Sequence, residues 1–343
     1  MKSLVAQNPF ASEAEVCLES RIERLCWSQQ GAALLASTAS GELILFDENG
    51  SVCHRWTGHD GRIIQIGLSC NNDFVASAGV DTATRLWSLA DVGKAVELER
   101  AGSVGKLAWS PWSRVLLTSR DQDISLWAQS GALVERLSEH TLPVVDLCWH
   151  PVERNIFASC ASDGIFVWEL GSSKSLYHLN GQGDPTYLRF NRLGSILAYA
   201  CRDSSVRVWV VGSGIVLQLN GAGEIKSLDW SWGGRWLAIC SEYSAYVWKF
   251  DDRRFESAQP TKLNGPTAPL TTMAFHPFEH LLACGDQSGA VYVWRTDLGN
   301  RTAPVVVARG QSAVTALAWN PFKNQLAVSF YDGSLRFWSS EFK

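Results

Sequence analysis

A short apolar run that ends on an aromatic residue recurs along the whole chain of 343 residues. The closing aromatic residues stand at Phe46, Trp87, Trp127, Trp168, Trp209, Trp248, Trp294 and Trp338. Subtracting each position from the next gives spacings of 41, 40, 41, 41, 39, 46 and 44 residues. A nearly constant period of this length is typical of chains built from stacked units, in which each unit covers an apolar face of its neighbour.

Each unit contains further strand-like runs. A second signature, apolar–x–x–apolar–x followed usually by an aromatic residue, precedes each closing run, and a third apolar run such as Leu34–Ser37 lies between the two. The second signature has copies at Ile22–Trp27, Ile63–Leu68, Val104–Trp109, Val144–Trp149, Ile225–Trp230, Leu270–Phe275 and Val314–Trp319, with a weaker copy at Pro185–Phe190. The runs are short, alternate in polarity and are separated by Gly, Asp, Asn and Pro, which indicates strands. Four strands in about 41 residues predict a β-propeller blade rather than a helical repeat.

The ends of the chain indicate how the ring closes. The eighth unit stops at Trp338 with only SSEFK after it, whereas the segment Glu13–Leu18 precedes the first unit and is strand-like. We therefore predict one all-β domain, a closed propeller of eight four-stranded blades, in which Glu13–Leu18 completes the last blade. Residues 1–12 would be an N-terminal extension and residues 13–343 the propeller. A seven-bladed ring is the alternative, and it would leave one unit outside the ring, whereas full closure removes exposed strand edges.

The repeats resemble the WD40 family, and the resemblance covers nearly the whole chain. The family carries a Gly-His at the start of each unit, an Asp in the turn before the third strand, and a closing Trp-Asp. This sequence keeps Gly58-His59 and, less well, Glu139-His140, and only Phe46-Asp47 echoes the closing pair. The turn Asp is kept at Asp81, Asp163, Asp203, Asp286 and Asp332. The resemblance implies a propeller that binds other proteins.

The same resemblance implies a hydrogen-bonded network inside two units. Its members are His59, Ser77, Asp81 and Trp87 in one unit, and His140, Ser159, Asp163 and Trp168 in the other. A buried imidazole or carboxylate is costly unless each finds a partner, and the serine and the indole N–H would end the chain of bonds. A His, a Ser and an Asp also form hydrolase triads, but a triad is needed once, and repetition in register favours a structural role.

Turns between the first and second strands carry unusual apolar residues. They contain Pro111-Trp112, Pro151-Val152, Ser231-Trp232, Pro277-Phe278 and Pro321-Phe322. By the family's geometry these turns share one face of the ring, called the bottom. Two interpretations stay open: the side chains form an exposed interaction patch, or each ring folds over its own blade and caps the core.

Two further segments are candidates for partner contact. The long connection after Trp248 carries Asp251, Asp252, Arg253 and Arg254, which would form either a binding loop or a solvated tip. On the opposite face, the loops that lead into the innermost strands contribute Arg62, Lys106 and Lys226. Acidic residues lie close to them in the sequence, so no field of a single sign is expected there.

Composition narrows the function classes. The chain has 30 Lys and Arg against 34 Asp and Glu, a net charge of −4, so it lacks the basic excess of a nucleic-acid-binding protein. No apolar run reaches the roughly 18 residues of a membrane-spanning helix. The nine cysteines form no CxxC pairs, which favours reduced thiols and a cytoplasmic location. No paired ligands or Gly-rich phosphate loop predict a metal or cofactor.

These observations favour a non-catalytic scaffold that binds partner proteins or peptides on a face of the propeller. Two alternatives remain. The first is a propeller enzyme that uses the central channel, which would need acidic, basic or imidazole groups converging from several blades. The second is a recognition module for basic tails, which would need an acidic ring around the channel, and Arg62 and Lys226 oppose such a ring. The partner and the oligomeric state are not fixed by the sequence.

Overall fold

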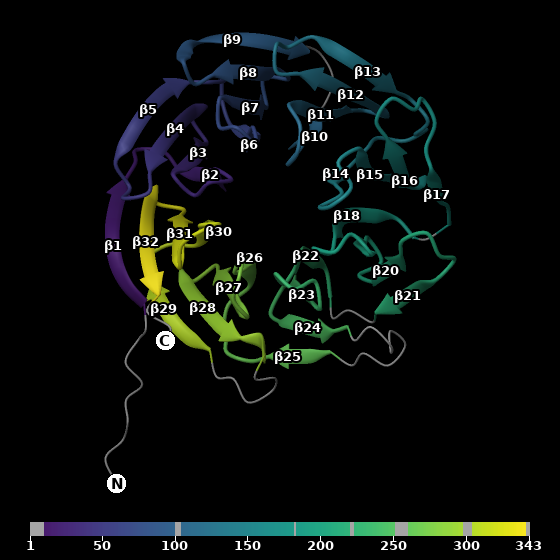
Figure 1. Cartoon of the computed structure of the whole chain (residues 1–343). Helices are drawn as coiled ribbons and strands as arrows, with labels where there is room; N and C mark the ends of the chain where they lie inside the picture. Colours follow the sequence, from purple (N-terminus) through teal and green to yellow (C-terminus); the bar gives the residue numbers. More distant parts are fainter. Residues whose placement is uncertain are drawn as a thin grey trace.

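The chain forms a ring of small antiparallel sheets around a central axis (Figure 1). The computed structural model describes residues 10–99, 104–181, 183–219, 223–250, 260–297 and 304–340. In this part of the chain the strands form eight four-stranded sheets, which we number blades 1 to 8 in chain order. The prediction of eight blades is confirmed, and the seven-bladed alternative is wrong.

Each blade is a meander whose first strand lies innermost. Blade 1 contains β2 (Ile22–Trp27), β3 (Ala33–Thr38), β4 (Glu42–Asp47) and β5 (Val52–Thr57); blade 2 contains β6 (Ile63–Leu68), β7 (Phe74–Gly79), β8 (Thr84–Ser88) and β9 (Asp91–Glu99). Blade 3 contains β10 (Val104–Trp109), β11 (Val115–Arg120), β12 (Asp123–Ala128) and β13 (Leu133–Leu137); blade 4 contains β14 (Asp146–Trp149), β15 (Ile156–Ala161), β16 (Gly164–Glu169) and β17 (Tyr177–Leu179). Blade 5 contains β18 (Pro185–Phe190), β19 (Ile196–Cys201), β20 (Val206–Val210) and β21 (Val216–Leu219); blade 6 contains β22 (Ile225–Trp230), β23 (Trp236–Ser241), β24 (Ala245–Lys249) and β25 (Thr261–Leu263). Blade 7 contains β26 (Leu270–Phe275), β27 (Leu281–Asp286), β28 (Ala290–Arg295) and β29 (Val305–Arg309); blade 8 contains β30 (Val314–Trp319), β31 (Gln325–Phe330), β32 (Ser334–Ser340) and β1 (Phe10–Cys17).

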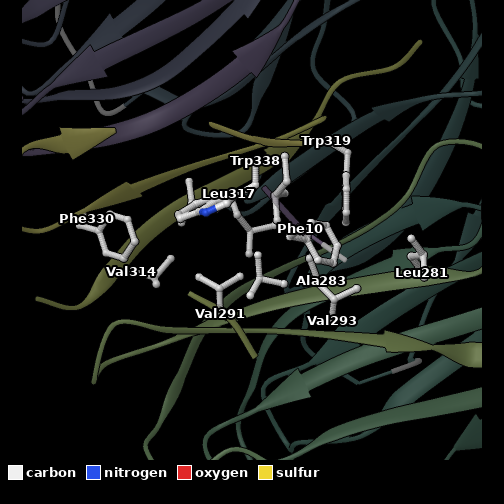
Figure 2. Packing of buried hydrophobic residues seen from close by; sticks show 13 residues of the cluster. Phe10, Leu281, Ala283, Val291, Val293, Val314, Leu317, Trp319, Phe330 and Trp338 are labelled. Atoms are coloured by element: carbon white, nitrogen blue, oxygen red, sulfur yellow. The ribbon is translucent and has the colours of Figure 1, made fainter. Parts of the chain in front are cut away.

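The two ends of the chain meet in blade 8, as predicted. Strand β1 pairs antiparallel with β32, with Val16 opposite Leu335 and Phe10 opposite Ser340. The strand begins three residues earlier than the predicted segment, because the Phe10 side chain is buried and its ring centroid lies 6.3 Å from that of Trp319. Figure 2 shows Phe10 packed among apolar residues of blades 7 and 8. The ring is therefore closed by a strand that comes from the other end of the chain.

Apolar side chains fill the spaces between neighbouring blades. The cluster in Figure 2 combines Leu281 and Val293 of blade 7 with Leu317 and Trp338 of blade 8. Equivalent clusters join the other blades, so each sheet buries its apolar faces against two neighbours. This arrangement explains the period in the sequence, because every blade needs the same apolar positions to cover the next.

Tryptophans at the ends of the innermost strands also join the blades by hydrogen bonds. Each indole Nε1–H donates to a backbone carbonyl in the innermost strand of the preceding blade. The pairs are Trp27 to Ala318 at 3.0 Å, Trp109 to Gly67 at 3.2 Å, Trp149 to Ala108 at 3.0 Å, Trp230 to Arg189 at 3.1 Å and Trp319 to Ala274 at 3.2 Å. Repeated tryptophan at this position therefore supplies a polar contact as well as packing volume.

In the other three blades the innermost strand ends on Leu or Phe, and a different side chain bridges the junction. Asp146 of blade 4 accepts from the Leu188 N–H of blade 5 at 3.0 Å. Asp229 of blade 6 accepts from the Phe275 N–H of blade 7 at 2.8 Å. Arg24 of blade 1 donates to the carbonyl of Ile64 in blade 2 at 3.3 Å. Charged side chains around the axis thus bridge these three junctions, two as acceptors of backbone N–H groups and one, Arg24, as a donor to a carbonyl.

Candidate functional site

The network predicted for blade 2 is present as a continuous chain of hydrogen bonds. His59 Nε2 lies 2.8 Å from Ser77 Oγ and His59 Nδ1 lies 2.8 Å from Asp81 Oδ1, while the Trp87 indole donates to Ser77 Oγ at 2.9 Å. Burial alone would raise the pKa of Asp81, but hydrogen bonds from Arg85 and His59 hold that pKa at about 2. The sequence did not single out Arg85, whose guanidinium lies 2.7 Å from the Asp81 carboxylate.

Blade 4 repeats this geometry. His140 lies 2.7 Å from both Asp163 Oδ1 and Ser159 Oγ, and the Trp168 indole donates to Ser159 Oγ at 2.8 Å. Ser77 and Ser159 are both 0% exposed, so neither hydroxyl can reach a substrate. In both blades the serine oxygen accepts a hydrogen bond from an indole N–H. The serines therefore have a structural role and are not activated as nucleophiles.

Four buried histidines make the fold sensitive to acid. Burial lowers the pKa of His59, His140 and His150, and it lowers the pKa of His276 from 6.5 to about 4. The unfolded chain therefore binds more protons below pH 6.5, and stability that is complete above this pH is lost as the pH falls toward about 4. We expect the denaturation midpoint in urea to drop across this window.

Substituting His276 should reduce that drop. Its Nδ1 accepts from the Glu279 N–H at 3.1 Å, a role that a glutamine oxygen can take without titrating. We expect His276→Gln to remove roughly 3 kcal/mol of the acid-induced loss. An acid-induced loss in the variant as large as in the parent chain would contradict the assignment to His276.

The predicted apolar turns lie on one face and their side chains are exposed. Trp112, Val152, Trp232, Phe278 and Phe322 follow the innermost strands of blades 3, 4, 6, 7 and 8, and Leu193 takes the same place in blade 5. These six side chains, which we call the bottom crescent, are between 39% and 67% exposed. Their exposure agrees with the interpretation as a surface patch, although the Phe278 ring also packs against His276 of its own turn. Leu193 was missed because its turn lacks Pro and an aromatic residue, although its offset of three from Phe190 matches the offset in blades 3, 4, 7 and 8. In blade 6 the offset from Trp230 to Trp232 is two.

The crescent occupies only part of the ring. In blades 1 and 2 the corresponding positions, three residues after Trp27 and Leu68, hold the polar residues Gln30 and Asn71. Six consecutive blades therefore carry an apolar residue at this turn and two adjacent blades carry a polar one. The asymmetry distinguishes the crescent from a position that every blade needs for folding.

Hydrogen bonds hold the crescent turns in place. The side chain that follows the innermost strand caps its own turn; for example, Ser110 Oγ accepts from the N–H of Trp112 at 3.2 Å. Longer side chains at this position also reach the next blade. His150 donates to the carbonyl of Gly194 at 3.0 Å, and Asn320 donates to the carbonyl of Gly31 at 2.8 Å. The apolar side chains thus sit on a preorganised frame, which lowers the entropic cost of binding.

The opposite face, called the top, carries the two His–Asp networks and mixed charges. Arg62 is exposed, Lys226 pairs with Glu224 at 2.8 Å, and Lys106 lies deeper, on β10 inside the ring. Asp146 is 1% exposed and pairs with Arg189 at 2.9 Å, so its carboxylate does not contribute to an acidic ring. Residues Asp251, Asp252, Arg253 and Arg254 lie outside the described part of the chain.

The histidines of the two His-Pro turns are used structurally. His150 and His276 each accept backbone N–H groups at Nδ1. Within the described ranges, no group of three or more His, Cys, Asp or Glu side chains is placed to hold a metal ion. In the same ranges, no helix is long and apolar enough to cross a membrane.

Together, the fold and the buried networks define a closed eight-bladed propeller with His–Ser–Asp–Trp hydrogen bonds in blades 2 and 4. The chain belongs to the WD40-repeat β-propeller family. The profile described as WD domain, G-beta repeat matches residues 50–88 and 131–169, the two segments that contain the networks, and that of the anaphase-promoting complex subunit 4 WD40 domain matches residues 273–343.

Curated relatives are distant in sequence. The chain is 25% identical over 51% of its length to a WD repeat-containing protein 91 homolog of Dictyostelium discoideum, and 25% identical over 68% to the transcriptional corepressor LEUNIG_HOMOLOG of Arabidopsis thaliana. The matched regions span 24% and 30% of those proteins. Eukaryotic translation initiation factor 3 subunit I of Culex quinquefasciatus is 20% identical over 80% of this chain and 93% of its own length.

A solved structure supports the fold. The computationally designed protein Ika8 superposes with a TM-score of 0.77 at 22% identity, covering 94% of this chain and 97% of that one. At this identity the likeness establishes the architecture and nothing about partners.

Proposed function

We propose that this propeller is a non-catalytic scaffold that binds a partner protein across the bottom crescent. The observation that carries the proposal is the exposed apolar residue at the equivalent turn of six consecutive blades. Exposed apolar side chains that gather on one face mark interaction sites, and aromatic residues dominate binding energy at such sites. The relatives whose names describe a corepressor and an initiation-factor subunit agree with a scaffold role.

Charges within the crescent turns indicate the chemistry of the partner. The six turns contain five basic residues and two acidic ones, Glu153 and Glu279, so their balance is 5 − 2 = +3 in a chain whose net charge is −4. The basic residues are Arg114, Arg154, Arg192, Arg235 and Lys323, and all five are exposed. Arg154 also lies over the ring of Trp112 at 5.8 Å. We therefore expect a protein segment that presents apolar side chains flanked by Asp or Glu.

The alternatives have less support. A hydrolase would need an accessible nucleophile, and both network serines are fully buried. A binder of basic tails would need free carboxylates around the axis, but Asp146 and Asp229 accept backbone N–H groups of the next blade. These two carboxylates are thereby explained by the joining of blades.

Peptide selection tests the crescent directly. A displayed peptide library is selected on the full chain and depleted on the variant Trp112→Ser/Trp232→Ser/Phe322→Ser. We expect the selected peptides to combine aromatic or aliphatic residues with Asp or Glu, and to bind the triple variant at least about 30-fold more weakly, because each removed ring is worth roughly 1–2 kcal/mol at an interface. Binding is measured by fluorescence anisotropy.

A second triple variant provides the control. Val52, Val134 and Ile215 are similarly exposed but lie on or beside the outer strands of blades 1, 3 and 5, so Val52→Ser/Val134→Ser/Ile215→Ser should bind the selected peptides as the parent chain does. Equal binding to the parent and to the crescent variant would refute the proposal. Tighter binding of a single-stranded RNA oligonucleotide than of the peptides would assign the basic and aromatic side chains to a different partner class.

A further inference from the structure

The top face contains a cavity that the scaffold proposal does not use. Its volume is about 500 Å³, and it opens at the inner ends of blades 3 to 6. The wall includes Val145 of blade 4 and Tyr187 of blade 5, while Lys106, Arg202, Glu224 and Lys226 contribute charged groups. Ligand sites combine apolar walls with convergent polar groups, and this cavity places Val145, Tyr187 and Ile225 beside its four charged side chains.

Lys106 is the most deeply placed of these charges. Its side chain is 22% exposed, and burial lowers the pKa of its ammonium group. The nearest carboxylate oxygen, Asp146 Oδ1, lies 3.6 Å away, which is long for a charge-assisted hydrogen bond. Asp146 is already engaged through Oδ2 by Arg189 at 2.9 Å and by the Leu188 N–H at 3.0 Å. One carboxylate therefore serves two cations, and Lys106 is left with a weak pair.

Lys106 is oriented toward the cavity wall. Its Nζ atom lies 5.8 Å from the ring centroid of Tyr187, which also lines the cavity. At the rim, Arg202 pairs with Asp184 at 2.7 Å and Lys226 pairs with Glu224 at 2.8 Å. Exposed pairs of this kind contribute little and can exchange partners when a ligand arrives.

The charges around the cavity do not balance. The ion-pair networks that contain the charged lining residues extend through Asp146 to Arg189. These networks comprise four cations, Lys106, Arg189, Arg202 and Lys226, and three anions, Asp146, Asp184 and Glu224. Their sum is 4 − 3 = +1, so one singly charged anionic group would neutralise the site. A dianion such as a phosphoryl group would leave an excess of negative charge beside Asp146 and Glu224.

We infer that this cavity binds an acidic side chain of a partner protein, with the carboxylate on the Lys106 ammonium group and the methylene carbons against Val145 and Tyr187. The site lies on the opposite face from the bottom crescent. A protein bound through the crescent therefore leaves it open, and the chain can hold two partners, one on each face. The inference does not depend on the crescent proposal.

Short peptides test this site on the full chain. The probes are N-acetyl-Ala-Glu-Ala-amide, the same peptide with Gln or phosphoserine at the centre, and N-acetyl-Ala-Ala-Ala with a free C-terminal carboxylate. We expect saturable binding of the Glu peptide by ligand-observed NMR titration, with affinity at least about 10-fold above that of the Gln peptide, because the Gln amide gains no charge-assisted bond to Lys106.

Variants connect the binding to Lys106. Lys106→Met should weaken binding of the Glu peptide at least about 10-fold. Lys226→Met should weaken this binding less, because Lys226 lies at the rim. Lys94→Met, on β9 and 84% exposed, should have no effect. The crescent variant Trp112→Ser/Trp232→Ser/Phe322→Ser should bind the Glu peptide normally, so failure of one proposal is distinguishable from failure of the other.

Three results would overturn the inference. The first is equal affinity for the Glu and Gln peptides, and the second is unchanged binding to Lys106→Met with its circular dichroism spectrum intact. The third is tighter binding of the free C-terminal carboxylate or of the phosphoserine peptide than of the Glu peptide. That result would assign the cavity to a chain terminus or to a phosphorylated segment.

Discussion

Deleting residues 1–17 is expected to destabilise the whole ring rather than only its last blade. Strand β1 covers the outer edge of β32, and Phe10 fills part of the core between blades 7 and 8. Loss of a buried Phe side chain alone costs about 3–5 kcal/mol, and the exposed edge of β32 would become a site for pairing between chains. We expect a loss of at least about 3 kcal/mol in the free energy of unfolding and concentration-dependent aggregation, measured by urea denaturation and size-exclusion chromatography.

A peptide supplied separately distinguishes this effect from general damage. A synthetic peptide of residues 8–19 should restore the denaturation midpoint of the deleted chain, because it can rebuild the antiparallel ladder from Phe10↔Ser340 to Cys17↔Ser334. The same peptide with Phe10→Ser should restore less. If the deleted chain is as stable as the parent chain, closure by β1 does not hold the ring together.

The repeats allowed the architecture to be predicted because identical physical demands recur in every blade. Each innermost strand must pack apolar side chains against the neighbouring blades. For this reason Ile22, Ile63 and Val314 recur in register, and the units can be counted. Both His–Asp networks were also predictable, since His59 and His140 each precede the closing tryptophan by 28 residues and the Ser and Asp offsets differ by only one residue between the two blades. Even the closing strand followed from a simple deficit, the absence of a fourth strand after Trp338.

The parts that failed to repeat could not be predicted in the same way. Asp146, Asp229 and Arg24 bridge the three junctions that lack an indole, and they do so with different chemistry, because the two carboxylates accept from backbone N–H groups and the guanidinium donates to a carbonyl. Position in the sequence marks these residues as lining the axis but does not say which atom they contact. The same limit applies to the cavity at Lys106, which depends on how four different blades converge.

Exposure of the bottom crescent was also beyond the sequence. A turn tryptophan such as Trp112 can fold inward or outward with the same local pattern. Ser110 Oγ accepts from both the Trp112 and Ser113 N–H groups, which fixes the backbone of the turn, and the Trp112 side chain is 45% exposed.

The second large effect is expected at Ser159, where a single hydroxyl supports two buried partners. Its oxygen lies 2.7 Å from His140 Nε2 and accepts the Trp168 indole N–H at 2.8 Å, and it is 0% exposed. Ser159→Ala would leave His140 Nε2 and Trp168 Nε1 buried without a hydrogen-bond partner, and each unpaired group costs about 1–3 kcal/mol. We expect a loss of roughly 2–5 kcal/mol in the free energy of unfolding, measured by urea denaturation at pH 7.

Ser37 offers a matched control because the same substitution should have the opposite sign there. It lies in the second strand of blade 1, as Ser159 does in blade 4, and is equally buried, but its hydroxyl has no hydrogen-bond partner. Removing an unpaired buried hydroxyl relieves a desolvation cost, so Ser37→Ala should leave stability unchanged or raise it by up to about 1 kcal/mol. If the two substitutions cost the same, burial of the serine, and not the network around His140, determines its contribution. The networks would then be incidental to the stability of the blades that carry the two WD-domain matches.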